Sequence, residues 1–116
     1  MSLWKYNDVE LEIDMEDVEF QEKYENAFSK MEESEKDLQN VGKISGFSKK
    51  YCGLFYNLFD DLFGSGTGEK LMGNKMNTGK CEECYNSFIS FCSEQVNEMN
   101  RRRAATLKKY VPKRKR

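Results

Sequence analysis

Histidine is absent from this 116-residue chain, so the commonest general base of enzymes and a frequent metal ligand are missing. Proline occurs once, and no run of about 18 apolar residues exists, so the sequence contains no candidate membrane-spanning helix. The N-terminal segment MSLWKYNDVE has neither a basic region nor an apolar run, so it does not predict a secretory signal. A reducing compartment and free thiols are therefore expected for the four cysteines.

The adjacent acidic residues give little indication of a catalytic acid/base pair. The adjacent acids Asp60 and Asp61 fall on the polar side of one expected helix, and Glu82 and Glu83 fall near the start of another. Acids in such places usually form a solvated surface or complement the helix dipole. We therefore expect a protein without enzymatic activity and without a cofactor.

Charge is distributed very unevenly along the chain, although its net value is only −1. Residues 1–41 hold 13 acids and 4 bases, whereas residues 99–116 hold 9 bases and no acid. This asymmetry bears on binding partners rather than on the fold.

An N-terminal β-hairpin is expected at about residues 3–13. Apolar residues alternate with polar ones on both sides of Asn7 and Asp8, which tolerate the positive φ of a tight turn. Because two strands alone are marginal in water, their apolar face is expected to rest on helices or on another subunit.

Helical spacing of apolar residues predicts three principal helices, so the expected fold is mainly α, with the hairpin first. The first helix follows Asp14 or Asp17 as its cap and ends near Gly42, and the second spans about 44–63. One short helical turn is expected within 64–78. The last helix, about 79–110, is expected to begin at a Thr78 cap and to end before Pro112. Residues 1–98 would form one domain, and residues 99–116 a basic helix end and tail.

The segment FGSGTGEK, residues 63–70, superficially suggests a phosphate-binding loop. A P-loop requires G-x-x-x-x-G-K-[ST], but Gly68 comes one position too early and is followed by Glu69 rather than lysine. A dinucleotide fingerprint fails at the same glutamate, and both motifs follow a strand rather than a helix. We expect a corner between two helices, closed by Gly64, with Ser65 or Thr67 capping the next helix.

The cysteines raise the question of a zinc site. Cys81 and Cys84 form a C-x-x-C, with Cys92 and Cys52 as further candidates. However, Cys81, Cys84 and Cys92 fall on the apolar side of the last helix, where free cysteine commonly behaves as a small buried hydrophobe. Core packing without a metal is the expectation; metal binding and redox chemistry are the alternatives.

The C-terminal segment has the composition of a nucleic-acid-binding arm. Bases also suit the C-terminal end of a helix, and they would pair with an acidic surface, such as residues 1–41 of a neighbouring copy. All three interpretations are open. The bases are Arg101, Arg102, Arg103, Lys108, Lys109, Lys113, Arg114, Lys115 and Arg116.

The order of these segments resembles small proteins encoded in the tail gene clusters of prophages of Gram-positive bacteria. The resemblance covers about residues 4–98, and its most specific part is FDDLFGSGTGEKLMG, residues 59–73. Some of these proteins are regarded as tail assembly chaperones. The resemblance implies a non-enzymatic protein of the bacterial host cytoplasm that coats the apolar helical tape-measure protein until tube subunits displace it.

The partner surface implied by this function would be the aromatic second helix. Its candidate partner-binding residues are Phe55, Phe59 and Phe63, although the same stripe would equally suit the core of the protein or an oligomer interface. Two other functions stay open. One is a small phage-encoded nucleic-acid-binding protein that uses the basic tail, and the other is a structural virion component.

Overall fold

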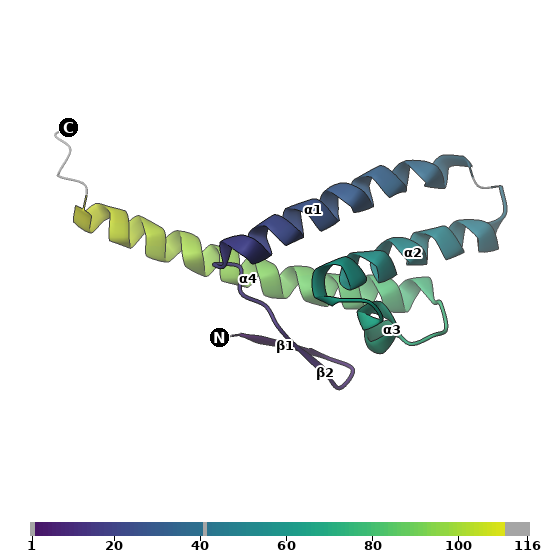
Figure 1. Cartoon of the computed structure of the whole chain (residues 1–116), viewed down its shortest axis with the longest axis horizontal. Helices are drawn as coiled ribbons and strands as arrows, with labels where there is room; N and C mark the ends of the chain where they lie inside the picture. Colours follow the sequence, from purple (N-terminus) through teal and green to yellow (C-terminus); the bar gives the residue numbers. More distant parts are fainter. Residues whose placement is uncertain (1, 41, 111–116) are drawn as a thin grey trace.

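The computed structural model describes residues 2–40 and 42–110, and it is mainly helical, with an N-terminal two-stranded hairpin. This confirms the fold class expected from the sequence. Figure 1 shows α1 and α2 as an antiparallel pair, with α4 running alongside and extending past the other elements at its C-terminal end. Within the described ranges, no helix has the length and apolar character needed to cross a bilayer.

The hairpin consists of β1 (Leu3–Tyr6) and β2 (Val9–Glu12), paired antiparallel. Asn7 and Asp8 connect the strands with φ values of 48° and 64°, which is the left-handed region that a two-residue hairpin turn requires. The alternation predicted from the sequence is therefore realised, because it directs Trp4 into the core.

The first helix, α1, spans Val18–Glu35 and continues as a short 3-10 helix, η1 (Lys36–Asn40). Asp17 caps α1 by accepting a hydrogen bond from the backbone N–H of Glu19. The second helix, α2, spans Ile44–Phe63, as the spacing of its apolar residues predicts. Its aromatic and leucine side chains pack against α1 on one side and α4 on the other.

The short helix α3 (Thr67–Met72) follows the glycine loop, and the long helix α4 (Thr78–Tyr110) completes the fold. The cap of α4 differs from the expectation. The side chain of Asn77, rather than Thr78, accepts the free N–H of Lys80 at 3.0 Å. Asparagine and threonine are both good caps, so the sequence alone does not discriminate between these neighbours.

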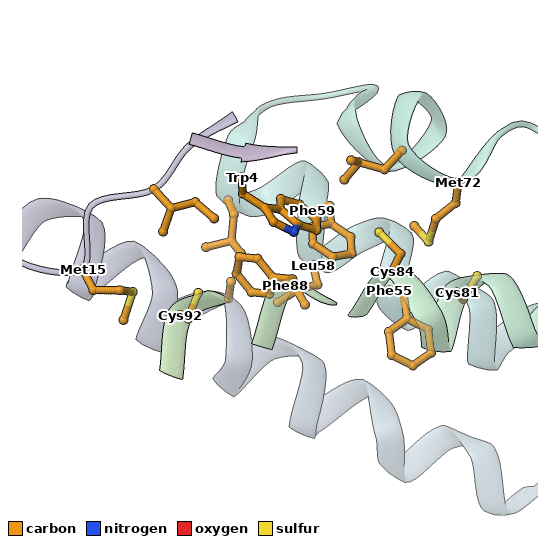
Figure 2. Packing of buried hydrophobic residues seen from close by; sticks show 14 of the residues in the cluster. Trp4, Met15, Phe55, Leu58, Phe59, Met72, Cys81, Cys84, Phe88 and Cys92 are labelled. Carbon is orange, nitrogen blue, oxygen red and sulfur yellow. The ribbon is translucent and has the colours of Figure 1, made fainter. Parts of the chain in front are cut away.

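The core is a single cluster centred on α2 and α4 (Figure 2). Trp4 stacks on Phe59 with ring centroids 5.8 Å apart and meets the edge of Phe88 at 5.4 Å. Phe59 and Phe88 are fully buried and contact each other edge to face. The hairpin therefore lies against α4 and contributes Trp4 to the helical core.

Polar contacts fix the hairpin to α4. The indole Nε1 of Trp4 donates to Oγ of Ser87 at 3.0 Å. The amide of Gln95 accepts from the N–H of Met15 and donates to the carbonyl of Ile13, so it satisfies the backbone where the chain leaves the hairpin. These bonds join residues that are 80 to 83 positions apart in sequence.

Candidate protein-binding groove and basic arm

The glycine loop is a corner between α2 and α3, as the failed phosphate-loop motifs indicate. Gly64 and Gly66 have φ values of 114° and 89°, which favour glycine. Neither Ser65 nor Thr67 caps α3, contrary to the expectation. Instead Asp60, one turn before the end of α2, accepts the N–H of Gly68 at 2.8 Å. A carboxylate thus occupies the helix end that a phosphate would need.

The four cysteines are free and buried. Burial raises the pKa of Cys84 and Cys92 to about 12, and burial together with a hydrogen bond to Cys52 does the same for Cys81. These groups are therefore neutral thiols near pH 7 in the metal-free protein, and their low thiolate content makes them weak nucleophiles. Among residues 2–40 and 42–110, no cluster of three or more His, Cys, Asp or Glu could hold a metal ion.

The three candidate partner-binding phenylalanines are mostly not on the surface. Phe55 and Phe59 are buried in the core, and Phe63 is half-buried against Phe20 and Phe88. A partner cannot contact Phe59 without opening the core. The stripe on α2 is therefore used by the protein's own core, and Phe55 and Phe59 do not form an exposed contact surface in the folded chain.

A groove remains open between α1, α2 and α4, with a volume of about 470 Å³. Its floor is aromatic: the ring centroid of Tyr85 lies 5.1 Å from that of Phe55 and 6.3 Å from that of Phe28, and Tyr51 meets Phe55 edge to face at 5.1 Å. The complete lining is Phe28, Met31, Glu32, Glu35, Tyr51, Leu54, Phe55 and Tyr85.

The apolar character of the groove continues toward the start of α2. Phe47 stacks on Tyr51 with centroids 5.8 Å apart, and it is 40% exposed. Ile44, one turn earlier, is 84% exposed. Large apolar side chains that are contiguous with an open groove are typical of a protein-binding surface. We refer to this lining, with Phe47 and Ile44, as the α1–α2–α4 groove.

Negative charge borders the groove on two sides. Glu32 and Glu35 line it from α1. On the α4 side, Glu82 accepts a hydrogen bond from the hydroxyl of Tyr51 at 2.6 Å, and this bond, with burial, raises the pKa of Tyr51 to about 12. The pKa of Tyr85 is raised first by burial and also by the charge of Glu35. An apolar segment flanked by positive charges would therefore suit the groove.

The basic segment begins as the free end of α4. Met99 is buried, and residues 100–109, the last ten whose exposure the structure describes, are all exposed. We call residues 100–110 the basic arm; it contains Arg101, Arg102, Arg103, Lys108 and Lys109. The other tail bases, Lys113, Arg114, Lys115 and Arg116, lie outside the described residues.

Two arm bases pair with acids of the same chain. Arg102 makes a two-pronged contact with Glu16, with one N–H to oxygen distance of 3.0 Å, and Arg101 contacts Glu98. The N-terminal acids and the basic segment thus meet at one point within the chain. Arg103, Lys108 and Lys109 make no ion pair with any described residue.

Sequence reasoning did not identify the groove. Phe28, Met31 and Tyr85 follow the same helical spacing as core residues, so their pattern carries no sign of partial exposure. One indirect signal was available: Ile44 and Phe47 place the apolar stripe of α2 at its very first turns, next to the break at Gly42.

Comparison with known proteins gives a family but no activity. A family model described as "Family of unknown function (DUF6673)" matches residues 7–116. No curated protein and no solved structure matches the chain.

Proposed function

Because the chain belongs to the DUF6673 family, whose description names no activity, we propose a function from the groove and from the resemblance in sequence: a non-enzymatic tail assembly chaperone. It acts in the host cytoplasm and binds apolar helical segments of the phage tape-measure protein. The observation that carries the proposal is the open aromatic groove between α1, α2 and α4.

The groove has the chemistry of helix-in-groove recognition. An amphipathic helix places apolar anchors at intervals of three or four residues into such a surface. Tyr51, Tyr85 and Phe28 offer broad faces, and Met31 adds a flexible side chain that adapts to differing partners. A tape-measure protein presents many similar apolar stripes, so an adaptable groove suits it better than a specific pocket does.

The groove also replaces the surface expected from the sequence. Phe55 contributes only its exposed edge, and Phe59 supports the floor from within the core. A rigid core beneath a half-buried lining allows binding without unfolding. The proposed chaperone therefore binds its client as a folded protein.

Co-expression with the tape-measure protein of the same gene cluster tests the proposal. In Met31→Glu, a charge enters the groove, and we expect capture of the tape-measure protein to fall about tenfold or more. Val18→Glu is the matched control, because Val18 lies on the same helix but is 62% exposed outside the groove. Both variants are first checked by thermal melting. Equal capture by folded Met31→Glu and by the control would contradict the proposal.

Nucleic-acid binding is a second candidate, supported by the position of the basic arm. Arg101 and Lys108, and likewise Arg102 and Lys109, are seven residues apart and therefore lie on one side of an exposed helix. Such a row would contact phosphates without reading sequence. Ion pairs of Arg101 and Arg102 with Glu98 and Glu16 reduce the charge available for this purpose.

A further inference from the structure

The basic arm has an apolar stripe between positive charges. Ala104 and Leu107 are three residues apart, so they share one side of α4, and Leu107 is 57% exposed. Arg103 precedes this stripe and Lys108 follows it. Because successive residues of an α-helix are rotated by about 100° around its axis, one base lies on each side of the stripe. The arm is therefore a short amphipathic helix whose apolar side has a cation on either edge.

This pattern is complementary to the α1–α2–α4 groove. The groove has an aromatic floor, with Glu35 on its α1 side and Glu82 on its α4 side. An arm lying in the groove would bury Leu107 against the floor and bring Arg103 and Lys108 to opposite acidic edges. Opposite charges in this arrangement favour encounter and fix the register of the two helices.

The arm cannot reach the groove of its own chain. It continues α4 without a break, and Figure 1 shows it leaving the body at the end opposite to the turn between α1 and α2. The groove residues of α1 and α2 lie toward that turn. Folding the arm back would require breaking the backbone hydrogen bonds of α4. The occupant must therefore come from another molecule.

We propose that the α1–α2–α4 groove of one copy binds the basic arm of a second copy, in a reciprocal dimer. A twofold arrangement places each arm in the other groove and covers both exposed apolar surfaces. This contact also regulates client binding, an inference that rests on the proposed function. The arm of the second copy covers the empty groove, and a client helix displaces the arm.

Charge reversal on each surface tests the dimer in the full-length protein. The arm variant is Arg103→Glu with Lys108→Glu, and the groove variant is Glu35→Lys with Glu82→Lys. All four side chains are exposed, so the fold should persist, and thermal melting checks this. A control with the same change of charge as the arm variant, Lys70→Glu with Lys75→Glu, lies on α3 and the loop that follows it.

Sedimentation velocity then reports the oligomeric state. We expect the wild type and the control to dimerise, more weakly as salt rises from about 0.1 M to 1 M and the screening length falls from about 10 Å to 3 Å. Each variant alone should be monomeric or about tenfold weaker in self-association. An equimolar mixture of the two variants should restore dimers, because both arm–groove contacts of the mixed pair again join opposite charges.

Three outcomes overturn the proposal: a monomeric wild type at low salt, dimers that survive reversal of the arm, or a mixture that does not recover. A monomeric wild type that binds duplex DNA through the arm would assign the arm to nucleic acid instead. Client capture separates this proposal from the chaperone function. If the mixture restores dimers but no variant captures the client, only the chaperone function is contradicted. If the client is captured but no dimer forms, only the arm–groove contact is contradicted.

Discussion

Gly68 of α3 lies directly against the backbone of Tyr56 in α2. A Cβ atom added to Gly68 would stand 2.9 Å from both the Cα and the carbonyl oxygen of Tyr56. The third glycine of the loop is therefore required by helix packing. This contact, together with the Asp60 cap, explains the glycine at position 68 by the packing of α3 on α2, without a phosphate ligand.

Gly68→Ala should destabilise the protein by about 1–3 kcal/mol, because backbone atoms cannot move aside as a flexible side chain would. Gly53→Ala is the control. It lies inside α2, where an added Cβ meets nothing within 4 Å, so we expect a gain of about 0.4–1 kcal/mol. Urea denaturation measures both. A neutral Gly68→Ala would show that α2 and α3 are not in close contact in solution.

Phe59→Ala should cost about 3–5 kcal/mol, since the ring is fully buried between Trp4 and Phe88. Phe47→Ala removes an equally large side chain that is 40% exposed, and it should cost much less. Denaturation midpoints compare the two variants. Similar losses of stability in the two variants would mean that Phe47 is covered in solution, for instance in a dimer. In that case, dilution of the protein would reduce the loss of stability caused by Phe47→Ala.

Asn77→Ala should destabilise the protein by about 1 kcal/mol through loss of the α4 cap, whereas Thr78→Ala should change stability by less than about 0.5 kcal/mol. The two positions are adjacent, so the pair isolates the capping hydrogen bond. Thermal melts distinguish the variants. A larger loss of stability for Thr78→Ala than for Asn77→Ala would show that Thr78 caps α4, as the sequence predicts.

Stability should fall as pH rises above about 9. Burial raises the pKa of the Cys81, Cys84 and Cys92 thiols from the ordinary value of 9.0 to about 12 in the folded protein. Between these values the unfolded state releases protons that the folded state keeps, which costs up to about 1.4 kcal/mol per pH unit for each thiol. Urea titrations from about pH 8 to 11 measure the slope. The variant Cys92→Ala should reduce this slope of stability against pH by the contribution of one proton. A stability that does not change over this pH range would contradict the burial of these thiols.

The full-length protein should bind duplex DNA only weakly, with a dissociation constant in the micromolar range or above and a steep dependence on salt. Each phosphate neutralised contributes about −0.9 to the log–log slope. Lys108→Glu with Lys109→Glu should weaken this binding and reduce the salt slope without changing the thermal midpoint, because both side chains are exposed. Sub-micromolar affinity at physiological salt, with no capture of the tape-measure protein, would favour the nucleic-acid function.

The helices and the hairpin were predictable because their signals are local and periodic. The pattern of Phe59, Leu62 and their neighbours specifies a helix face, and Asn7-Asp8 specifies a turn. Caps were less predictable, because the N–H of Gly68 takes its acceptor from Asp60 on a different helix. Such a bond depends on the angle between α2 and α3, which no local pattern encodes.

The groove was the least predictable feature. Whether Phe28 or Phe59 is buried depends on how far α1 diverges from α4, and both residues have the same helical spacing. The two acids on opposite edges of the groove could be read from the sequence only as part of the general surface charge. Glu35 and Glu82 are 47 positions apart, and only the tertiary structure places both beside tyrosines of one surface.

The attachment of the hairpin to α4 has a consequence for the order of events during synthesis. Trp4 and Ile13 leave the ribosome well before their hydrogen-bond partners Ser87 and Gln95, which lie on α4. The helical pair α1 and α2 can form earlier from neighbouring segments. The indole ring of Trp4 can therefore stack on Phe59 once α2 has formed, but its Nε1–H and the carbonyl of Ile13 must wait for these hydrogen-bond partners until α4 emerges.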